Sequence, residues 1–325
     1  MSHDSSAIHP KRPLLSPRRD GLWWGLLGVV AFSFTVPFTR IAVESGGMSP
    51  LFIGSARAVI AALLAAAAIM LTKQRMPQGI QWARLALVAG GVVVGFPLLT
   101  SFALTTAPAS HGAVVIALLP AATAVMVVIR THERPPLSFW VMATIGAIAA
   151  VIFAAIQGGG LNELHQSDLL LFGAVIAAAV GYAEGGLLAR ELGAWQTVSW
   201  ALLLSSPLMA GLTVFSIVDD APSGSPAEWA AFGYLAVVSM FLGFFAWYRG
   251  LAIGPMAQVS QVQLAQPVMT ICWAALILRE QLTWATVLGG VAVILCAAIA
   301  VRSRITKISK TDSQMASPVS LELRG

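Results

Sequence analysis

Long apolar stretches of the length that crosses a lipid bilayer fill most of the chain, and short polar or charged interruptions separate them. The first, from Gly21 to Thr39, follows a basic flank and has roughly the 20 residues that a transmembrane helix needs. This run lacks a small-residue cleavage site, so we interpret it as a membrane span rather than a signal peptide. Nine more spans are predicted near residues 50–72, 83–104, 108–129, 137–156, 167–189, 194–217, 228–248, 254–278 and 283–301. The pattern therefore predicts an all-α integral membrane protein with ten transmembrane helices.

One stretch of the chain occurs twice, at residues 108–133 and 255–280. Each copy begins at a proline that follows a small residue, contains one proline inside an apolar run, and leaves that run at a glutamate. An offset of 147 residues aligns Pro108 with Pro255, Pro120 with Pro267, Thr123 with Thr270, and Glu133 with Glu280. Such a long period indicates duplication of a large unit, which is typical of transporters.

The number of spans determines how the two copies are related. Five spans per half is an odd number, so the copies enter the membrane from opposite sides and form two inverted five-helix repeats. We place the first repeat at residues 21–156 and the second at residues 167–301, with cytoplasmic tails at residues 1–20 and 302–325. Two similar half-cups that face each other predict a cavity near the middle of the membrane, and this geometry gives alternating access.

The positions of the basic residues predict the orientation. With the N-terminus inside, all of the 19 lysines and arginines except Arg40, Arg57 and Arg279 fall on the cytoplasmic side. This is the bias that the positive-inside rule requires. The expected location is therefore a cell membrane of the bacterial inner-membrane type, with both termini in the cytoplasm.

Composition and motifs argue against several other classes. Hydrophobic residues make up 58% of the 325 residues and charged residues only 10%, against about a quarter in soluble proteins. The basic residues are scattered over short loops and tails, so nucleic acid is not an expected partner. Cys272 and Cys296 form no Cys-x-x-Cys pair and the five histidines lack metal-site spacing, so we expect neither a metal nor a cofactor. We expect no enzyme, because no loop supplies a polar catalytic cluster, and no primary active transport, because a phosphate-binding loop is missing.

The repeated motifs resemble those of the EamA-type exporters in the drug/metabolite transporter superfamily. The resemblance covers residues 21–301 and depends on Ala107-Pro108-Ala109, Pro120, Glu133, Gly146, Gly254-Pro255-Met256, Pro267, Glu280 and Gly289-Gly290. Arg57 also lies where the second span of this family often carries an arginine. The resemblance implies a transporter fold with both ends in the cytoplasm and a central cavity lined mainly by spans 1, 3, 4, 6, 8 and 9. It does not identify a substrate.

The ninth predicted span opens with four glutamines in nine residues. At 100° per residue, Gln258, Gln261 and Gln266 share one face of a helix, whereas Gln263 points elsewhere. An amide exposed to lipid would lose its hydrogen bonds, so this face must meet either protein or water. We assign the three glutamines of this face to the substrate site, and hydrogen bonding between helices is the alternative.

One histidine and two prolines extend the candidate site. The repeat offset aligns His111 with Gln258, so both halves place a polar side chain about one turn after the proline that begins the span. His111 is therefore a candidate substrate ligand, with a satisfied core histidine as the alternative. Pro120 and Pro267 each remove a backbone hydrogen bond in the middle of a span, and we predict that they kink their helices and act as hinges.

Three further side chains are assigned to substrate binding. Arg57 lies seven residues into the second span, about 10 Å from its outer end at 1.5 Å per residue, and binding to a carbonyl or a lipid headgroup is the alternative. Tyr182 lies in a glycine-rich stretch beside an acidic residue within the sixth span. Trp247 is placed to stack on a substrate, and membership of an aromatic belt at the membrane surface is the alternative.

Glu184 is that acidic residue, and no other acid lies well within a predicted span. It is six residues, about 9 Å, from Arg190 at the cytoplasmic end of its span. We do not expect an ion pair with Arg57, which lies near the other face of the membrane. We therefore predict that Glu184 binds substrate and couples transport to protons, and a hydrogen-bonded glutamate that never titrates is the alternative.

These observations predict a secondary transporter that exports small polar or amphipathic metabolites, such as amino acids, by alternating access. A cavity with amides, one histidine and few charges suits a neutral or zwitterionic solute. One alternative is a multidrug exporter of lipophilic cations, with Glu184 as the anionic anchor, and another is a structural or sensing membrane protein. The expected partners are a small-molecule substrate and membrane lipid, and a homodimer is left open.

Overall fold

The computed structural model describes residues 17–132, 134, 136–158, 165–253, 259 and 262–315, and every regular element within these segments is a helix. The first half contains α1 (Pro17–Ser33), α2 (Thr35–Glu44), α3 (Pro50–Thr72), α4 (Ile80–Val88), η1 (Ala89–Gly95), α5 (Phe96–Ala103), α6 (Ala109–Ile116), α7 (Leu119–Thr131) and α8 (Leu137–Gly158). The second half contains α9 (Gln166–Leu192), α10 (Ala194–Asp219), α11 (Pro226–Tyr234), η2 (Leu235–Gly243), α12 (Phe244–Ile253), α14 (Ala265–Ile277) and α15 (Trp284–Met315).

Eight runs of helix among the described residues are long and apolar enough to cross a membrane. They are Asp20–Glu44, Pro50–Thr72, Ile80–Ala103, Ala109–Thr131, Leu137–Ile156, Gln166–Leu192, Ala194–Asp219 and Pro226–Ile253. Two shorter apolar helices, Ala265–Ile277 and Trp284–Ala300, lie where the ninth and tenth spans were expected. The prediction of an all-α membrane protein is confirmed, whereas the count of ten spans is confirmed only in part.

Local sequence signals explain where the second span begins and ends. Ser49 caps α3, because its hydroxyl accepts a hydrogen bond from the backbone N–H of Phe52, and Pro50 follows in the first turn where no N–H is needed. The helix ends at Lys73, which adopts a left-handed conformation with φ of 48°. The polar residues between apolar runs therefore fix the ends of α3 as well as separating the spans.

The two halves interrupt their helices at corresponding places. The segments η1 and η2 are π-helical, and the repeat offset of 147 residues places residues 89–95 on residues 236–242, within η2. A turn at Ala117 and Leu118 separates α6 from α7, and a turn at Gln263 and Leu264 precedes α14 at nearly the same place in the second half. Such interruptions recur at the binding sites of transporters built from inverted repeats.

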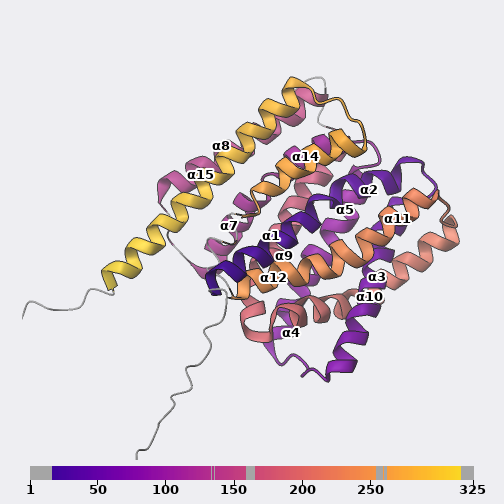
Figure 1. The fold of residues 1–325 in the computed structure, drawn as a ribbon, viewed down its shortest axis with the longest axis horizontal. Coiled ribbons are helices and arrows are strands. Elements are labelled where there is room, and N and C mark those ends of the chain that lie inside the picture. Colours follow the sequence, from indigo (N-terminus) through magenta and orange to yellow (C-terminus); the bar gives the residue numbers. More distant parts are fainter. Residues whose placement is uncertain are drawn as a thin grey trace, which may run out of the picture.

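The sixth span, α9, lies within the bundle and packs against helices of both halves, among them η1, α5, α7 and α12 (Figure 1). Small residues allow the closest approach: a Cβ atom added to Gly91 of η1 would lie 2.4 Å from the carbonyl oxygen of Ala177. The last spans of the two halves, α8 and α15, run side by side at one edge of the molecule (Figure 1). The α9 helix of the second half therefore packs directly against η1, α5 and α7 of the first half.

Candidate functional site

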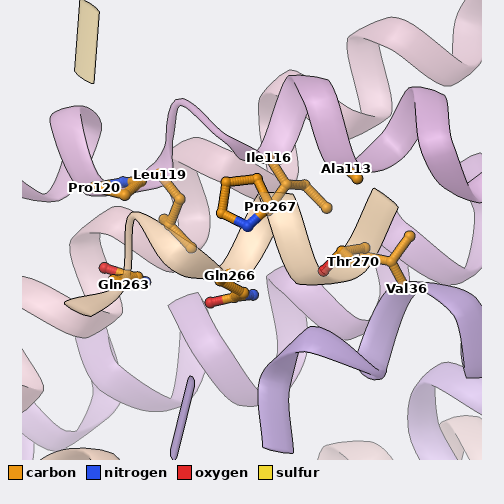
Figure 2. A pocket seen from close by; sticks show the side chains of 9 residues that line it. All are labelled: Val36, Ala113, Ile116, Leu119, Pro120, Gln263, Gln266, Pro267 and Thr270. Atoms are coloured by element: carbon orange, nitrogen blue, oxygen red, sulfur yellow. The ribbon is translucent and has the colours of Figure 1, made fainter. Parts of the chain in front are cut away.

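The fourth span, which is broken between α6 and α7, and the ninth span, which is broken just before α14, meet at a narrow cleft. We call it the central cleft. Figure 2 shows the side chains that line it, and they come from α2, from the break between α6 and α7, and from the start of α14. The lining residues are Val36, Ala113, Ile116, Leu119, Pro120, Gln263, Gln266, Pro267 and Thr270. The volume of the cleft is about 10 Å³, which is enough for about one water molecule. The cleft is therefore nearly closed in this conformation.

Both predicted hinge prolines lie at the central cleft. Pro120 is in the first turn of α7, and Pro267 is in the first turn of α14. Proline is tolerated at these positions because the first N–H groups of a helix have no partner within it. The chain is thus interrupted just before each proline rather than merely kinked at it. A hinge motion at these breaks stays a prediction.

The break in the ninth span changes the direction of one glutamine. The sequence predicted that Gln263 points away from Gln266, but both side chains line the central cleft (Figure 2). The difference arises because residues 263 and 264 form a turn, so the rotation of 100° per residue does not hold between them. Gln258 and Gln261, which were assigned to the same site, lie outside the described residues.

The two glutamines leave amide atoms without partners. The Nε2 atom of Gln263 and the Oε1 atom of Gln266 are buried, and no described residue forms a hydrogen bond with either. Buried polar atoms in native proteins nearly always have a partner, so an unpaired donor and an unpaired acceptor at one cleft call for a polar ligand or water. Bonding between helices accounts for neither of these two atoms.

A hydrogen bond between the two halves closes one side of the cleft. Pro37 lacks an N–H group, so the carbonyl of Ser33, four residues earlier, has no donor within its own helix. The hydroxyl of Thr270 donates to this oxygen at 2.9 Å, and the indole Nε1–H of Trp273 donates to the Ser33 hydroxyl at 3.0 Å. This contact was not predicted, although Pro37 in the first span indicates an unpaired carbonyl four residues earlier.

His111 lies apart from the central cleft. Its Nε2–H donates to the Oδ1 atom of Asp168 at 2.6 Å, and its ring lies 5.1 Å from the ring of Phe153. Both partners are buried, with exposed fractions of 7% for the His111 side chain and 2% for that of Asp168. These contacts agree with the alternative of a satisfied core histidine, and the sequence analysis did not name Asp168 as its partner. Among the described residues, no group of three or more His, Cys, Asp or Glu side chains is placed to hold a metal ion.

Arg57 is buried on α3, and none of the described acidic side chains is its counterion. Only 1% of the residue is exposed, and its Nε and Nη2 atoms have no hydrogen-bond partner among the described residues. No acidic side chain among the described residues forms an ion pair with it, and its burial separates it from the lipid headgroups. A guanidinium group cannot lose its charge in a protein, so an anion or water must accompany it.

Tyr182 and Trp247 are brought together in an aromatic cluster between α1, α9 and α12. The Tyr182 ring lies 6.1 Å from that of Trp247, 6.2 Å from that of Phe32 and 5.9 Å from that of Phe244. Trp247 is only 2% exposed and its Nε1–H has no partner among the described residues. A side chain this deeply buried does not belong to an aromatic belt at the membrane surface.

Glu184 is held by two arginines of the first half. Its Oε2 atom accepts a hydrogen bond from Nε of Arg130 at 2.7 Å, and its Oε1 atom is paired with Nε of Arg84. Arg84 also pairs with Glu191 at the end of α9. An ion pair of Glu184 was weighed from the sequence with Arg57 alone and was not expected, although Arg84 and Arg130 were predicted at the same end of the bundle as Glu184. A role of Glu184 in proton coupling stays a prediction.

The chain is similar to known membrane transporters. The model of the EamA-like transporter family matches residues 19–155 and again residues 165–302. An uncharacterized transporter of Bacillus subtilis (strain 168), YdeK, is 43% identical over 279 residues, which cover 86% of this chain and 96% of that protein. An uncharacterized transporter of Archaeoglobus fulgidus is 26% identical over 86% of this chain and 99% of its own length. A solved crystal structure covers 89% of this chain and 99% of its own, with a TM-score of 0.61 and 19% identity, which supports the fold alone.

Proposed function

Because the chain belongs to the EamA-like transporter family, matched by both of its halves and by a relative 43% identical in sequence, we propose that it is a secondary transporter that exports a small polar or amphipathic metabolite. The single observation that carries the proposal is the central cleft between the two interrupted spans, with its unpaired glutamine atoms. An amino acid is the solute class that best fits the groups in the protein core.

The glutamines support a solute that both donates and accepts hydrogen bonds. The Nε2–H₂ of Gln263 offers donors, and the Oε1 atom of Gln266 offers an acceptor. When a polar solute fills these positions, its hydrogen bonds take the place of those that the amides make with water, at little cost in free energy. An apolar solute leaves the two amides unpaired. This difference favours polar over purely apolar cargo.

The buried guanidinium group of Arg57 supports a solute with a carboxylate. No acidic side chain among the described residues accompanies this arginine, and its Nε and Nη2 atoms have no partner there, so a carboxylate of the solute would supply both an opposite charge and hydrogen-bond acceptors. A neutral polar solute does not meet this need, and a phosphate ester with two charges exceeds it. Arg57 does not line the central cleft in this conformation, so a zwitterion would meet both the arginine and the glutamine amides only after the halves separate.

The size of the cleft supports alternating access. At about 10 Å³ it has no room for a metabolite, so the two halves must separate before a solute enters. The pseudo-symmetric breaks at the prolines supply places at which each half can bend, as in other transporters built from inverted repeats. The bias of the basic residues supports a cytoplasmic location for both termini.

The test is transport by the purified protein in proteoliposomes with a panel of radiolabelled solutes. We expect counterflow of amino acids, and we expect Gln266→Leu to reduce it at least tenfold while the yield of monodisperse protein is unchanged. Gln281→Leu, at an exposed glutamine outside the cleft, is the matched control and should transport normally. Movement of lipophilic cations alone would favour the multidrug alternative, and no transport of any solute would contradict the proposal.

A further inference from the structure

Pairs of ionisable side chains connect the fourth span to the sixth at both of its ends. The fourth span, α6 and α7, belongs to the first half and the sixth, α9, to the second, so both contacts connect the halves. At one end Arg130 pairs with Glu184, and at the other His111 pairs with Asp168. Any motion that opens the protein between these two spans must therefore break one pair or the other.

The chemistry of the two ends differs. Among the described residues Glu184 pairs with two arginines, Arg84 and Arg130, and arginine keeps its charge at every physiological pH. The strength of that contact cannot be changed by adding a proton to its basic partner. Imidazole is the side chain whose charge changes within the physiological range. Of these two contacts, therefore, the one between His111 and Asp168 is the one whose basic partner can gain or lose a proton.

The His111–Asp168 pair is buried but borders a space that reaches the surface. A cavity of about 210 Å³, which we call the vestibule, is lined by Thr106, Ala107, Pro108, His111, His165, Ser167 and Asp168. Three of these residues, Thr106, Pro108 and His165, are exposed. The vestibule has room for several water molecules and enough polar groups to hold them. Water in the vestibule gives the buried pair a route for protons.

We propose that the His111–Asp168 pair is a proton-binding site that controls this end of the contact between the two halves. In the neutral form, the Nε2–H of His111 donates to the Asp168 carboxylate. The incoming proton, delivered by water, adds to Nδ1, to which no described residue is bonded. The product is an imidazolium–carboxylate ion pair with the same Nε2–H···Oδ1 hydrogen bond. The ligand of this site is a single proton, which binds and leaves without the transfer of any other group.

The surroundings of the pair contain few competing charges. His111 lies on α6, which packs against α2, α8, α9, α14 and α15. The titratable or charged groups on this side are Asp168 on α9, His165 before it, the ion pair of Arg40 and Glu44 on α2, Cys272 on α14, and Arg279 and Glu280 after α14. The Arg40 guanidinium also donates to the carbonyls of Leu104 and Thr105. The Glu280 carboxylate accepts hydrogen bonds from the backbone N–H groups of Ala109 and Ser110. The α8 sequence contains no titratable residue, and that of α15 contains one before Arg302, the free thiol of Cys296.

The charge change fixes the direction of the switch. Protonation turns a hydrogen bond between a neutral ring and a carboxylate into a charge-assisted ion pair, which is stronger in a buried place. A low pH in the vestibule therefore holds α6 against α9, and loss of the proton loosens them. In an exporter this step would couple release of solute to the proton gradient. This link to transport rests on the proposed function, whereas the proton-binding site does not.

The site can be tested with protons alone, without a transported solute. Proteoliposomes on a solid-supported membrane are exposed to a rapid pH jump, and the transient charge displacement reports binding of protons by the protein. We expect a transient in the wild-type protein, its loss to the level of empty liposomes in His111→Gln, and an unchanged transient in His165→Gln, which alters the neighbouring exposed histidine. Glu184→Gln should also keep the transient.

A second variant protects the test against misfolding. Asp168→Asn removes the charge that stabilises the imidazolium, so the pH at half of the displacement should fall while the amplitude persists. A purely structural role of Asp168 would leave that pH unchanged. A full transient in His111→Gln, a transient lost only in Glu184→Gln, or no transient in the wild-type protein would each overturn the proposal. None of these results depends on whether a solute is transported, so they are separate from failure of the transport assay.

Discussion

The hydroxyl of Thr270 donates a hydrogen bond to the carbonyl oxygen of Ser33, 2.9 Å away and 237 residues distant in the chain. The bond satisfies a carbonyl that Pro37 leaves without a helical donor. It also connects the first span of one half to the ninth span of the other, beside the central cleft. A local effect of one proline is therefore compensated by the opposite repeat.

Replacing Thr270 by valine should destabilise the protein. Valine keeps the shape of threonine but leaves the buried Ser33 oxygen without a donor, which costs about 1–3 kcal/mol. The expected result is a lower midpoint of thermal unfolding in detergent, measured by intrinsic fluorescence. Thr123→Val is the matched control, because Thr123 is the repeat-related residue and its buried hydroxyl has no partner among the described residues. Equal midpoints for the two variants would contradict the assigned role of the bond.

Adding one methyl group at Gly91 should disrupt the packing of η1 on α9. Its Cβ atom would lie 2.4 Å from the carbonyl oxygen of Ala177, a backbone atom that cannot move without shifting α9. Gly91→Ala should therefore lower the yield of folded protein and its thermal midpoint by several degrees. The adjacent Gly90→Ala is the control, since nothing lies within 4 Å of its Cβ position and alanine favours helix by about 1 kcal/mol. Two equally stable variants would show that η1 and α9 do not approach as described.

Replacing Arg57 by methionine should raise stability and remove the response to solute. Arg57 is 1% exposed, and its Nε and Nη2 atoms have no partner among the described residues, so an apolar side chain of similar length removes a desolvation cost. We expect a higher thermal midpoint without solute, and no further rise when an amino acid that stabilises the wild-type protein is added. Arg249→Met is the control, because that guanidinium lies 5.1 Å from the ring of Trp24 at an exposed position. An undiminished solute response in Arg57→Met would remove Arg57 from the binding site.

The repeat in the sequence predicted the parts of the fold that each half determines by itself. The aligned prolines located the two breaks, and the end of the second predicted span coincides with the end of α3 at Thr72. Apolar length and turn residues act locally, so they can be read along the chain. The direction of Gln263 could not be read in this way, because it depends on the turn that ends the regular rotation of the helix.

The contacts between the halves were not predicted. The pairs of Glu184 with Arg84 and Arg130 join residues that are 100 and 54 positions apart in the chain. The positive-inside rule placed all three side chains at one end of the bundle, but it contains no information on which spans are neighbours. The same limit applies to His111, because the sequence does not show that Asp168, at the start of the sixth predicted span, is its neighbour. Pairing across the repeat boundary is a property of packing, and packing was visible only in three dimensions.

Glu184 provides the last test, because two roles for it lead to different results. In the structure its carboxylate is the shared acceptor for Arg84 and Arg130, and only 3% of the Glu184 side chain is exposed. Glu184→Gln leaves two guanidinium groups facing a neutral amide, so we expect a lower thermal midpoint and a protein that opens more readily at this end. Glu191→Gln should have a smaller effect, because the Glu191 side chain is 47% exposed and water replaces its contact with Arg84.

A double substitution separates the loss of an ion pair from the loss of a proton site. If Glu184 acts by holding the arginines, then Arg84→Gln combined with Glu184→Gln should recover part of the stability lost in the single variant, because no buried charge is left unpaired. Transport driven by a pH gradient should recover with it. If instead Glu184 carries the coupled proton, the single variant keeps its stability and solute exchange at equal pH but loses gradient-driven accumulation, and the second substitution restores nothing. The second pattern would move proton coupling from the His111 end of the sixth span to its Glu184 end.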